Sequence, residues 1–434
     1  MNWTVGRTGG LAVGLVAVFL SGGPPATVRE SFRVRPSAVL PGCEPDNGGL
    51  TLPADFCAVV VADQVGAARH LAVAQNGDVF VALAGGRAGA GGLLALRDTS
   101  GDGKADVRQT IGSEGGTGIA LGKGVLYFGT TSTVYRYTMR AGSLTPLGAP
   151  GVIVKDLPTG GHSAKNLALS PDGRMLFVNS GSATNSCQIA DRSNESRGKD
   201  PCPELAFRAG VWRFDALKHD QTEADGTRFA TGIRNAVGLA FAPSGELYAT
   251  QHGRDQLGQN WPKLFTLEQS AEKPSEELFE LSEGDDYGWP YCYHDPELGH
   301  LVLAPEYGGD GKTVGRCQEK KEPLVAFPAH WAPDGLTFYG GTQFPAHYRG
   351  GAFVAFHGSW NRAPLPQGGY RVVFVPFKDG KPAGTYETFA DGFWHENGTG
   401  PQHRPVGVAM GPDGSLYISD DAAGRIWRVM YRGR

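Results

Sequence analysis

The chain has 434 residues and a formal net charge of −4, with no block of basic or acidic residues. Because phosphate recognition needs clustered Lys and Arg, this charge pattern argues against nucleic acid as a partner. The 65 glycines follow no Gly-X-Y period, which excludes collagen. Together with 29 prolines and many short apolar runs, they indicate a turn-rich β protein.

The N-terminal residues 1–26 are typical of a secretory signal peptide. Arg7 supplies a positive charge, residues 10–20 (GLAVGLVAVFL) are apolar, and a small, proline-containing stretch follows. The apolar stretch is short for a membrane span, so we expect cleavage and no stable span afterwards; an uncleaved anchor is the alternative. Residues 27–56 form a polar lead-in, and residues 57–434 form the folded domain. The protein is therefore expected to be periplasmic or secreted.

Six cysteines fall into three local pairs, and each pair brackets a loop rich in Gly, Pro, Asn and Asp. An even number of cysteines in an exported chain favours disulfides, for which six cysteines allow about 15 connectivities. No Cys-x-x-Cys-His motif for a covalent c-type haem is present. We predict the sequential pairing: Cys43 with Cys57, Cys187 with Cys202, and Cys292 with Cys317.

One pattern recurs along the chain: an apolar strand, a turn containing Gly, and a second strand. Asn-Gly, Asp-Gly and Ser-Gly supply the positive φ that tight hairpins need. A single hairpin is only marginally stable in water, whereas several that stack their faces form a continuous core. Copies of the pattern lie at residues 70–83, 117–130, 166–180, 237–250, 335–357 and 405–420.

The spacing of the first three copies, ~40–50 residues, predicts a β-propeller, and six copies predict an all-β, six-bladed one. A pair of β-sandwiches or a solenoid is the alternative. A strand at residues 59–61 is expected to join the C-terminal IWRVMY segment and close the ring. Longer gaps between later copies indicate inserted loops, the usual place for a binding site. We place these insertions at 186–207, 255–300 and 305–329, with one short helix at 275–281.

Four of the polar residues that the repeat unit does not explain precede hairpins. His162 follows a flexible Gly pair, and histidine is the commonest general base; a hydrogen-bonded loop histidine is the alternative. Arg234 and Asn235 precede the hairpin at 237–250, and Arg404 takes the same position before the last hairpin. Arginines at equivalent positions of two repeats are expected to face the propeller axis, where an anionic ligand would bind them.

Two loops have oxygen ligands that suit Ca²⁺. Residues 252–255 (His-Gly-Arg-Asp) combine a close-approaching Gly with backbone carbonyls and a carboxylate. Residues 98–106 resemble a calcium loop, but Gln109 stands where an EF-hand has its closing Glu. A turn held by Asp side chains is an equal alternative there. Aromatic residues in 287–292 and 330–335 can stack on a planar ligand or pack in the core.

Seven segments occur in a fixed order: GGH, GIRN, HGRDQLG, GDDYGWP, HWAPDGLTFY, FHGSWNR and RPVGVAMGPDGSLYISDD. From about Cys43 to its C-terminus the chain therefore resembles the sorbosone dehydrogenases and soluble glucose dehydrogenases. The sorbosone dehydrogenase-like branch is the most similar. This resemblance implies a six-bladed propeller with the cofactor pyrroloquinoline quinone on its axis and Ca²⁺ beside it.

The resemblance also implies roles for individual residues. The glucose dehydrogenases use a cofactor-binding lysine that has no clear counterpart here, and their extra pair of calcium ions cannot be placed. His357 or Arg362 is expected to substitute for the lysine. The other implied roles are His162 as catalytic base, Arg234 at the quinone oxygen, Asn235 beside it, His330 in the cofactor pocket, Arg404 at the cofactor carboxylates, and the carbonyls of Gly253 and Arg254 on Ca²⁺.

We therefore expect an exported quinoprotein that oxidises a sugar, a sugar aldehyde or a related alcohol. Since the chain has no haem motif, electrons are expected to pass to a separate acceptor, a cytochrome or a quinone. Two alternatives remain. A calcium-dependent lactonase would need carboxylate ligands on the axis, and a non-catalytic sugar-binding propeller would keep the fold without cofactor capture.

Overall fold

The computed structural model describes residues 40–86, 89–395 and 398–433. The predicted signal peptide and the lead-in as far as residue 39 lie outside these ranges. The described chain is mostly strand, and its main sheets are six antiparallel units of four strands each, the third extended by β17 (Asp285–Asp286). In the described part, no helix is both long and apolar enough to cross a membrane.

The first three blades are β2 (Ala68–Val73), β3 (Val79–Ala84), β4 (Gly91–Arg97) and β5 (Val107–Ile111); β6 (Gly116–Gly122), β7 (Val125–Thr130), β8 (Val134–Thr138) and β9 (Gly151–Val154); and β10 (Leu167–Leu169), β11 (Met175–Ser180), β12 (Gly210–Asp215) and β13 (Thr227–Thr231). The last three are β14 (Leu239–Phe241), β15 (Leu247–Gln251), β16 (Glu276–Leu281) and β20 (Val325–Phe327); β21 (Pro333–Phe338), β22 (Ala352–Phe356), β23 (Arg371–Val375) and β26 (Glu387–Ala390); and β27 (Pro405–Met410), β28 (Leu416–Asp420), β29 (Ile426–Tyr431) and β1 (Phe56–Ala62).

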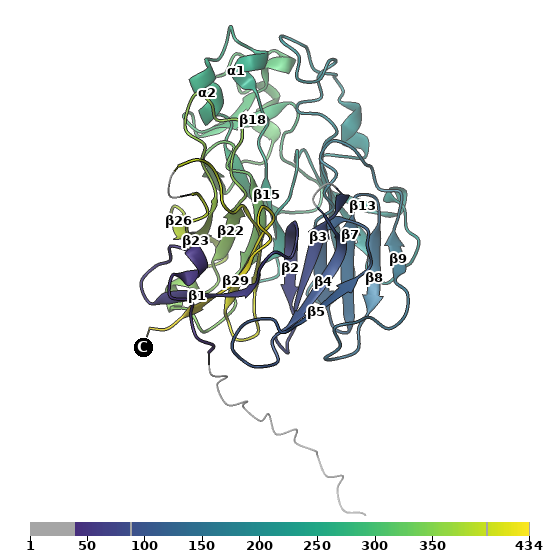
Figure 1. Cartoon of the computed structure of the whole chain (residues 1–434). Coiled ribbons are helices and arrows are strands. Elements are labelled where there is room, and N and C mark those ends of the chain that lie inside the picture. Colours follow the sequence, from purple (N-terminus) through teal and green to yellow (C-terminus); the bar gives the residue numbers. More distant parts are fainter. Residues whose placement is uncertain (1–39, 87–88, 396–397, 434) are drawn as a thin grey trace, which may run out of the picture. The chain divides into compact units, whose positions relative to one another are not determined.

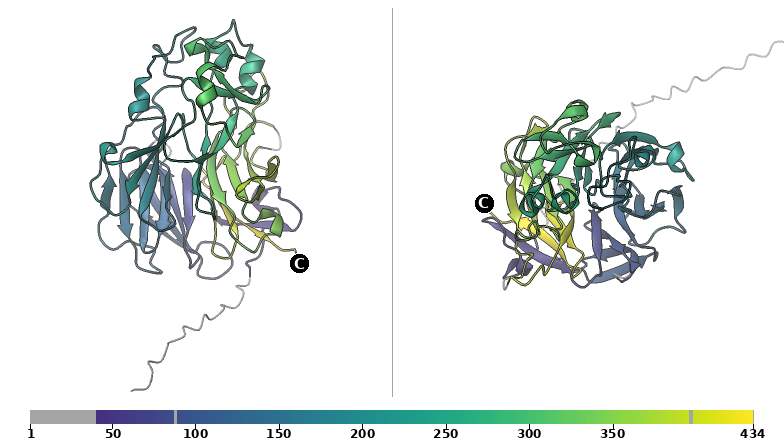
Figure 2. Two further views of the ribbon diagram at one scale, coloured as in Figure 1. Left: turned by 180° about the vertical axis from the view of Figure 1, so that it is seen from behind. Right: turned by 90° about the horizontal axis from the view of Figure 1, so that it is seen from above.

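The six blades form a closed ring. Their first strands, β2, β6, β10, β14, β21 and β27, contact one another in this order, and β27 contacts β2. Figure 2 shows the ring from above, with the purple and blue blades opposite the green and yellow ones. The predicted six-bladed propeller is confirmed. Buried clusters join neighbouring blades, as where Tyr127 of the second blade and Trp212 of the third lie in one cluster.

The ring is closed by the two ends of the described chain, as predicted. Strand β1 pairs antiparallel with β29, with Phe56 opposite Tyr431. The Phe56 ring packs edge-on against Phe344 of the fifth blade, with ring centroids 4.8 Å apart. The described part of the lead-in packs here too, since the Gly48 carbonyl accepts a hydrogen bond of 3.0 Å from Trp427 Nε1. Closure therefore buries the start of the domain against its last blade.

The insertions gather at one end of the propeller, at the top of Figure 1, where α1 (Leu257–Asn260), α2 (Leu267–Glu272) and β18 (Cys292–Asp295) lie together. The predicted helix at 275–281 is wrong, because residues 276–281 form β16. Pairing with β15 and β20 makes it a strand and buries it almost completely. The smaller elements are β19 (His300–Leu303), β24 (Phe377–Lys378), β25 (Lys381–Pro382), η1 (Asn47–Gly49), η3 (Pro203–Ala206), η4 (Glu223–Asp225), η5 (Pro305–Tyr307), η6 (Gly315–Glu319) and η7 (Ala346–Tyr348).

All three predicted disulfides are present. One of them closes the insertion between β11 and β12, and another joins β18 to η6 within the insertion between β16 and β20. Each such bridge removes chain entropy from the unfolded state, which typically stabilises a fold by about 2–4 kcal/mol. The second and third disulfides thus tie down long inserted loops.

Candidate active site

The polar residues that precede the inner strands converge at the end of the propeller that carries the insertions. A cavity of about 520 Å³ lies there. Its volume is in the usual range for a small-molecule site. The hydroxyl of Thr117 on its wall is buried without a hydrogen-bond partner. The wall also includes Arg69, Ser163, His357, Arg404 and Asp421.

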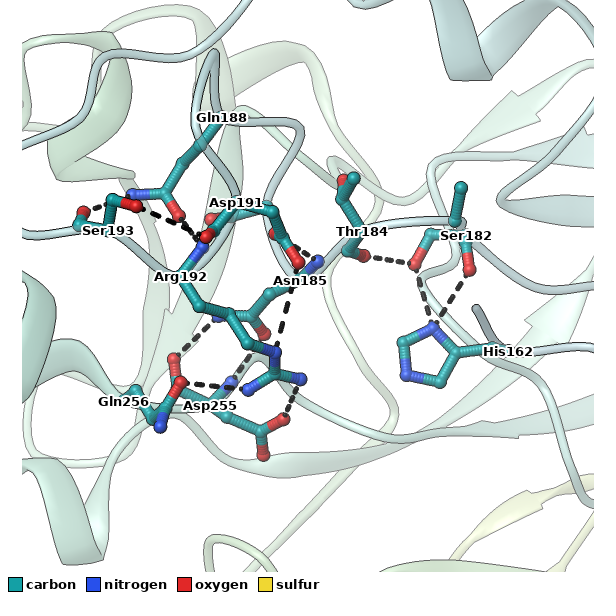
Figure 3. A network of polar contacts seen from close by, with 12 residues as sticks. His162, Ser182, Thr184, Asn185, Gln188, Asp191, Arg192, Ser193, Asp255 and Gln256 are labelled. Carbon is teal, nitrogen blue, oxygen red and sulfur yellow. Dashed lines mark hydrogen bonds and ion pairs between the residues drawn. The ribbon is translucent and has the colours of Figure 1, made fainter. Parts of the chain in front are cut away.

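The imidazole of His162 is held in one tautomer (Figure 3). Its Nδ1 lies 3.0 Å from both the carbonyl and the hydroxyl oxygen of Ser182. That hydroxyl donates its own hydrogen to the Thr184 carbonyl, 2.7 Å away, so both Ser182 oxygens act as acceptors. Nδ1 therefore carries the proton, and Nε2 is left with a free electron pair. This is the tautomer in which Nε2 can act as a base.

His162 is also kept neutral. Burial lowers the pKa of its imidazole to about 3, and the nearby charges of Arg234 and His252 act in the same direction. Gly181 permits this close packing, because a Cβ there would lie 2.6 Å from the His162 Cβ and 2.8 Å from Asn235 Oδ1. The side chains of His162 and Asn235 thus approach each other across a position where only glycine fits.

Arg234 is buried, and four hydrogen bonds fix its guanidinium. Nε and Nη2 donate to the backbone and side-chain oxygens of Asn185, at 3.1 and 3.0 Å. Nη2 also donates to Asp255 Oδ2 at 3.0 Å, and Nη1 donates to the Gly253 carbonyl at 2.9 Å. The predicted Arg234, Asn235 and 252–255 loop therefore do lie together. Arg234 and Asn235 are not part of the wall of the 520 Å³ cavity.

Asp255 connects segments that are far apart in the sequence (Figure 3). Its Oδ2 accepts from Arg192, 2.9 Å away. The same oxygen also accepts from Arg234. Its Oδ1 accepts from Asn361 Nδ2 at 2.7 Å. Burial works to raise the pKa of this carboxyl, but Arg234 and Arg192 hold it well below its usual range. Nitrogen donors bind both oxygens, so the Asp255 carboxylate links the loops that supply these donors.

The two residues predicted as calcium ligands lie on this loop. The Gly253 N–H donates to Glu276 Oε2 at 2.8 Å, and the other oxygen of Glu276 accepts from the Ala332 N–H at 3.1 Å. The Arg254 guanidinium forms a buried ion pair of 2.5 Å with Glu306. Backbone carbonyls of this loop are hard donors of the kind Ca²⁺ takes. The roles of Gly253 and Arg254 as ligands stay predictions.

A chain of ion pairs that sequence reasoning missed crosses the propeller axis. Arg69 on β2 contacts Asp334 on β21 at 2.9 Å and Asp421 after β28 at 2.6 Å. His252 contacts Asp334 at 2.9 Å, and His357 contacts Asp421 at 2.8 Å. Burial works to raise the pKa of Asp334, yet Arg69 and His252 lower it far below its usual range. Sequence reasoning could have singled out Arg69 and Asp334 from their position in the repeat, because both lie at the start of inner strands.

Arg404 differs from Arg234 in facing the large cavity. Its Nε and Nη2 donate to the carbonyls of His357 and Gly358, at 3.1 and 2.8 Å. Its guanidinium lies 5.7 Å from the centroid of the Tyr370 ring. In the described part of the chain, no carboxylate lies within ion-pair distance of Arg404. Its positive charge is therefore free to meet an anion in the cavity.

Two other predicted cofactor residues sit in the rim. His330 is buried with Nε2 2.8 Å from the Ser270 carbonyl and Nδ1 3.9 Å from Asp255 Oδ1. Arg362 donates to three backbone carbonyls, of Ala271, Ala329 and Pro366. These contacts hold loops in place. The roles of His330, Arg362 and His357 at a cofactor stay predictions.

The contacts at the remaining motifs favour structural roles. Asp98 accepts hydrogen bonds from the backbone N–H groups of Ser100, Gly101 and Gly103, as a turn requires. The indole of Trp289 is buried and donates to the Asn185 carbonyl at 3.0 Å. The Trp331 ring packs edge-on against the core.

A family model described as TrAA12-like matches residues 50–432. The chain belongs to that family. A curated relative, the pyrroloquinoline quinone-dependent pyranose dehydrogenase of Coprinopsis cinerea, is 26% identical over an alignment of 285 positions that covers 54% of this chain and 36% of that protein. The matching segments cover less than half the length of the curated relatives.

Solved structures share the fold. A calcium structure of the Trichoderma reesei carbohydrate-active enzyme of family AA12 has a TM-score of 0.72 at 21% identity, covering 88% of this chain and 97% of that one. The holo form of the quinone domain of the Coprinopsis cinerea pyranose dehydrogenase has a TM-score of 0.72 at 19% identity, covering 91% and 99%. The resemblance to quinone-dependent sugar dehydrogenases is confirmed, and the sorbosone branch stays a prediction.

We expect His162 to remain neutral with its proton on Nδ1 across the range from pH 8 to pH 5. The pKa of its imidazole is lowered to about 3 by burial and by Arg234 and His252. Nitrogen-15 NMR of the cofactor-free protein measures both tautomer and titration. A titration midpoint near the ordinary histidine value of about 6.5, or a proton on Nε2, would contradict this account.

The Asp255→Asn variant should lower the free energy of unfolding by about 3–5 kcal/mol, because it leaves the buried Arg234 without its anion. Urea denaturation measures the change. Glu283→Gln is the matched control, since it breaks an exposed pair with Arg213 that is worth at most about 1 kcal/mol. Equal destabilisation of the two variants would contradict the role of Asp255 in linking these loops.

Proposed function

We propose that this protein is an exported quinoprotein that oxidises a sugar, a sugar aldehyde or a related alcohol with pyrroloquinoline quinone and Ca²⁺. The observation that carries the proposal is a neutral, oriented His162 next to Ser163 on the wall of a cavity that also carries Arg404, a cation without a carboxylate partner. Family membership and the shared fold support it, because the related pyranose dehydrogenase is quinone-dependent. The three disulfides support an oxidising, extracytoplasmic location.

The residues of the cavity fit this cofactor. Pyrroloquinoline quinone is a planar tricarboxylate, and the cavity of about 520 Å³ offers the guanidinium of Arg404 and the unpartnered hydroxyl of Thr117. Arg404 would hold a carboxylate, as arginine does wherever charge and geometry must both match. Backbone carbonyls of Gly253 and Arg254, which lie outside the wall of this cavity, would hold Ca²⁺. Arg69 also lies on this wall, but Asp334 and Asp421 balance its charge, so Arg404 is the cation left for the cofactor.

When bound, the quinone supplies the two-electron oxidant that no side chain of this protein provides. The protein's part is to place the substrate and move a proton. His162 Nε2 would accept the proton of the reacting hydroxyl, while the Ser182 carbonyl fixes the ring through Nδ1–H. Arg234, held rigid by Asn185 and Asp255, would stabilise negative charge that develops nearby.

The electron acceptor is proposed to be a separate cytochrome or quinone, because the sequence has no haem-attachment motif. The lactonase alternative is less well supported by the contacts. It calls for free carboxylates on the axis, whereas Asp334, Asp421 and Asp255 are each paired with arginine or histidine. The sugar-binding alternative leaves the neutral, oriented His162 without a purpose.

Loading the purified cofactor-free protein with pyrroloquinoline quinone and Ca²⁺ should give dye reduction that depends on an added aldose or sorbosone. His162→Ala should bind the quinone about as well as the wild type and reduce dye roughly 10²–10⁴-fold more slowly, since it lacks the base. Quinone uptake is followed by absorbance and turnover by dye bleaching. The proposal would be contradicted if the wild-type protein took up no quinone at micromolar quinone concentrations. Undiminished turnover in His162→Ala would remove His162 from its role.

A further inference from the structure

Trp360 is the most exposed aromatic side chain of the described residues beside the candidate site, with 65% of its surface accessible. In the described part of the chain its indole has no hydrogen bond, ring contact or ion pair. Large apolar side chains scattered over a surface need no explanation by themselves. The setting of this one is unusual, because hydrogen bonds hold the residues on both sides of it.

Each neighbour of Trp360 is tied to another part of the site or rim. The N–H of Ser359 donates to the Gly368 carbonyl at 2.9 Å, and its hydroxyl donates to Gln367 at 2.7 Å. On the other side, Asn361 donates to Asp255 at 2.7 Å. Arg362 then donates to backbone carbonyls of the neighbouring loops. Several hydrogen bonds therefore fix the loop that holds this aromatic ring in solvent.

The loop also borders the cavity. The carbonyls of His357 and Gly358 bind Arg404, and both His357 and Arg404 line the cavity wall. Trp360 follows His357 by three residues, which is at most about 11 Å of chain. Trp360 thus lies on the chain between the segment that binds Arg404 and Asn361, which binds Asp255.

We propose that Trp360 is a substrate-binding residue that stacks on the apolar C–H face of a pyranose ring. A cyclic sugar offers one apolar face together with hydroxyl groups on its edge. The loop offers both, since the exposed indole of Trp360 stands between two polar residues, Ser359 and Asn361. A rigid aromatic residue supplies contact area at little entropic cost, because its backbone is already ordered. This assignment of a cyclic sugar rests on the proposed function.

The test uses the full protein loaded with pyrroloquinoline quinone and Ca²⁺. Trp360→Ala should raise KM for the aldopyranose substrate about 10-fold, with kcat, quinone affinity and KM for the dye unchanged. Trp360→Phe should restore most of the affinity because it keeps a stacking face. Leu217→Ala, which removes a similarly exposed apolar side chain after β12, is the matched control and should behave as the wild type.

A second readout does not need turnover. Tryptophan fluorescence of the cofactor-free protein should change on titration with D-glucose, D-galactose, D-mannose or D-xylose, and not with the acyclic D-sorbitol. Trp360→Phe should lose that response. Wild-type protein that responds to a pyranose but reduces no dye would defeat the proposed function and leave this assignment standing.

Three results would overturn the assignment. The first is an unchanged sugar KM in Trp360→Ala when the wild type turns over. The second is a raised KM for the dye or a weakened quinone affinity, which would place Trp360 at the acceptor or the cofactor. The third is a fluorescence response that persists in Trp360→Phe or is absent for every pyranose.

Discussion

The buried ion pair between Arg234 and Asp255 is the interaction on which the arrangement of the site depends. Arg234 begins the fourth blade, and Asp255 follows the second strand of the same blade. Through Arg192 and Asn361, the same carboxylate also holds the insertion of the third blade and the rim loop of the fifth. A buried charge is tolerated only when its partners satisfy it, and here both oxygens are satisfied. The Asp255 carboxylate therefore links loops from three blades.

Charge balance at the axis then decides what the cavity can bind. Asp334 and Asp421 neutralise Arg69 and draw in His252 and His357, so this network is close to self-contained. Arg404 stands apart, because backbone carbonyls rather than a carboxylate hold it. The guanidinium of Arg404 is already oriented, so an anion that enters the cavity can bind it with little reorganisation. His162 is kept neutral by burial and by Arg234, which suits a proton acceptor rather than an anion ligand.

The propeller and its closure could be predicted from the sequence, because the patterns that indicate them are repeated or local. Gly-containing turns recur at each hairpin, and β1 was visible as an apolar strand with no partner nearby. Residues 276–281 were misjudged because EELFEL is compatible with a helix, and only pairing with β15 and β20 makes it a strand. The residues at the ends of inner strands could be predicted from their repeat position. Asn185, Glu276 and Asp421 could not, since their importance comes from contacts across blades that no local pattern encodes.

The central claim is that the cavity beside Arg404 takes pyrroloquinoline quinone. The most direct measurement is a crystal structure of the protein grown with the quinone and Ca²⁺. The account predicts quinone density in the cavity lined by Thr117, His357 and Arg404, with a cofactor carboxylate on the Arg404 guanidinium and His162 Nε2 facing the open side. Quinone bound elsewhere, or a cavity that stays closed to it at saturating concentration, would contradict the account.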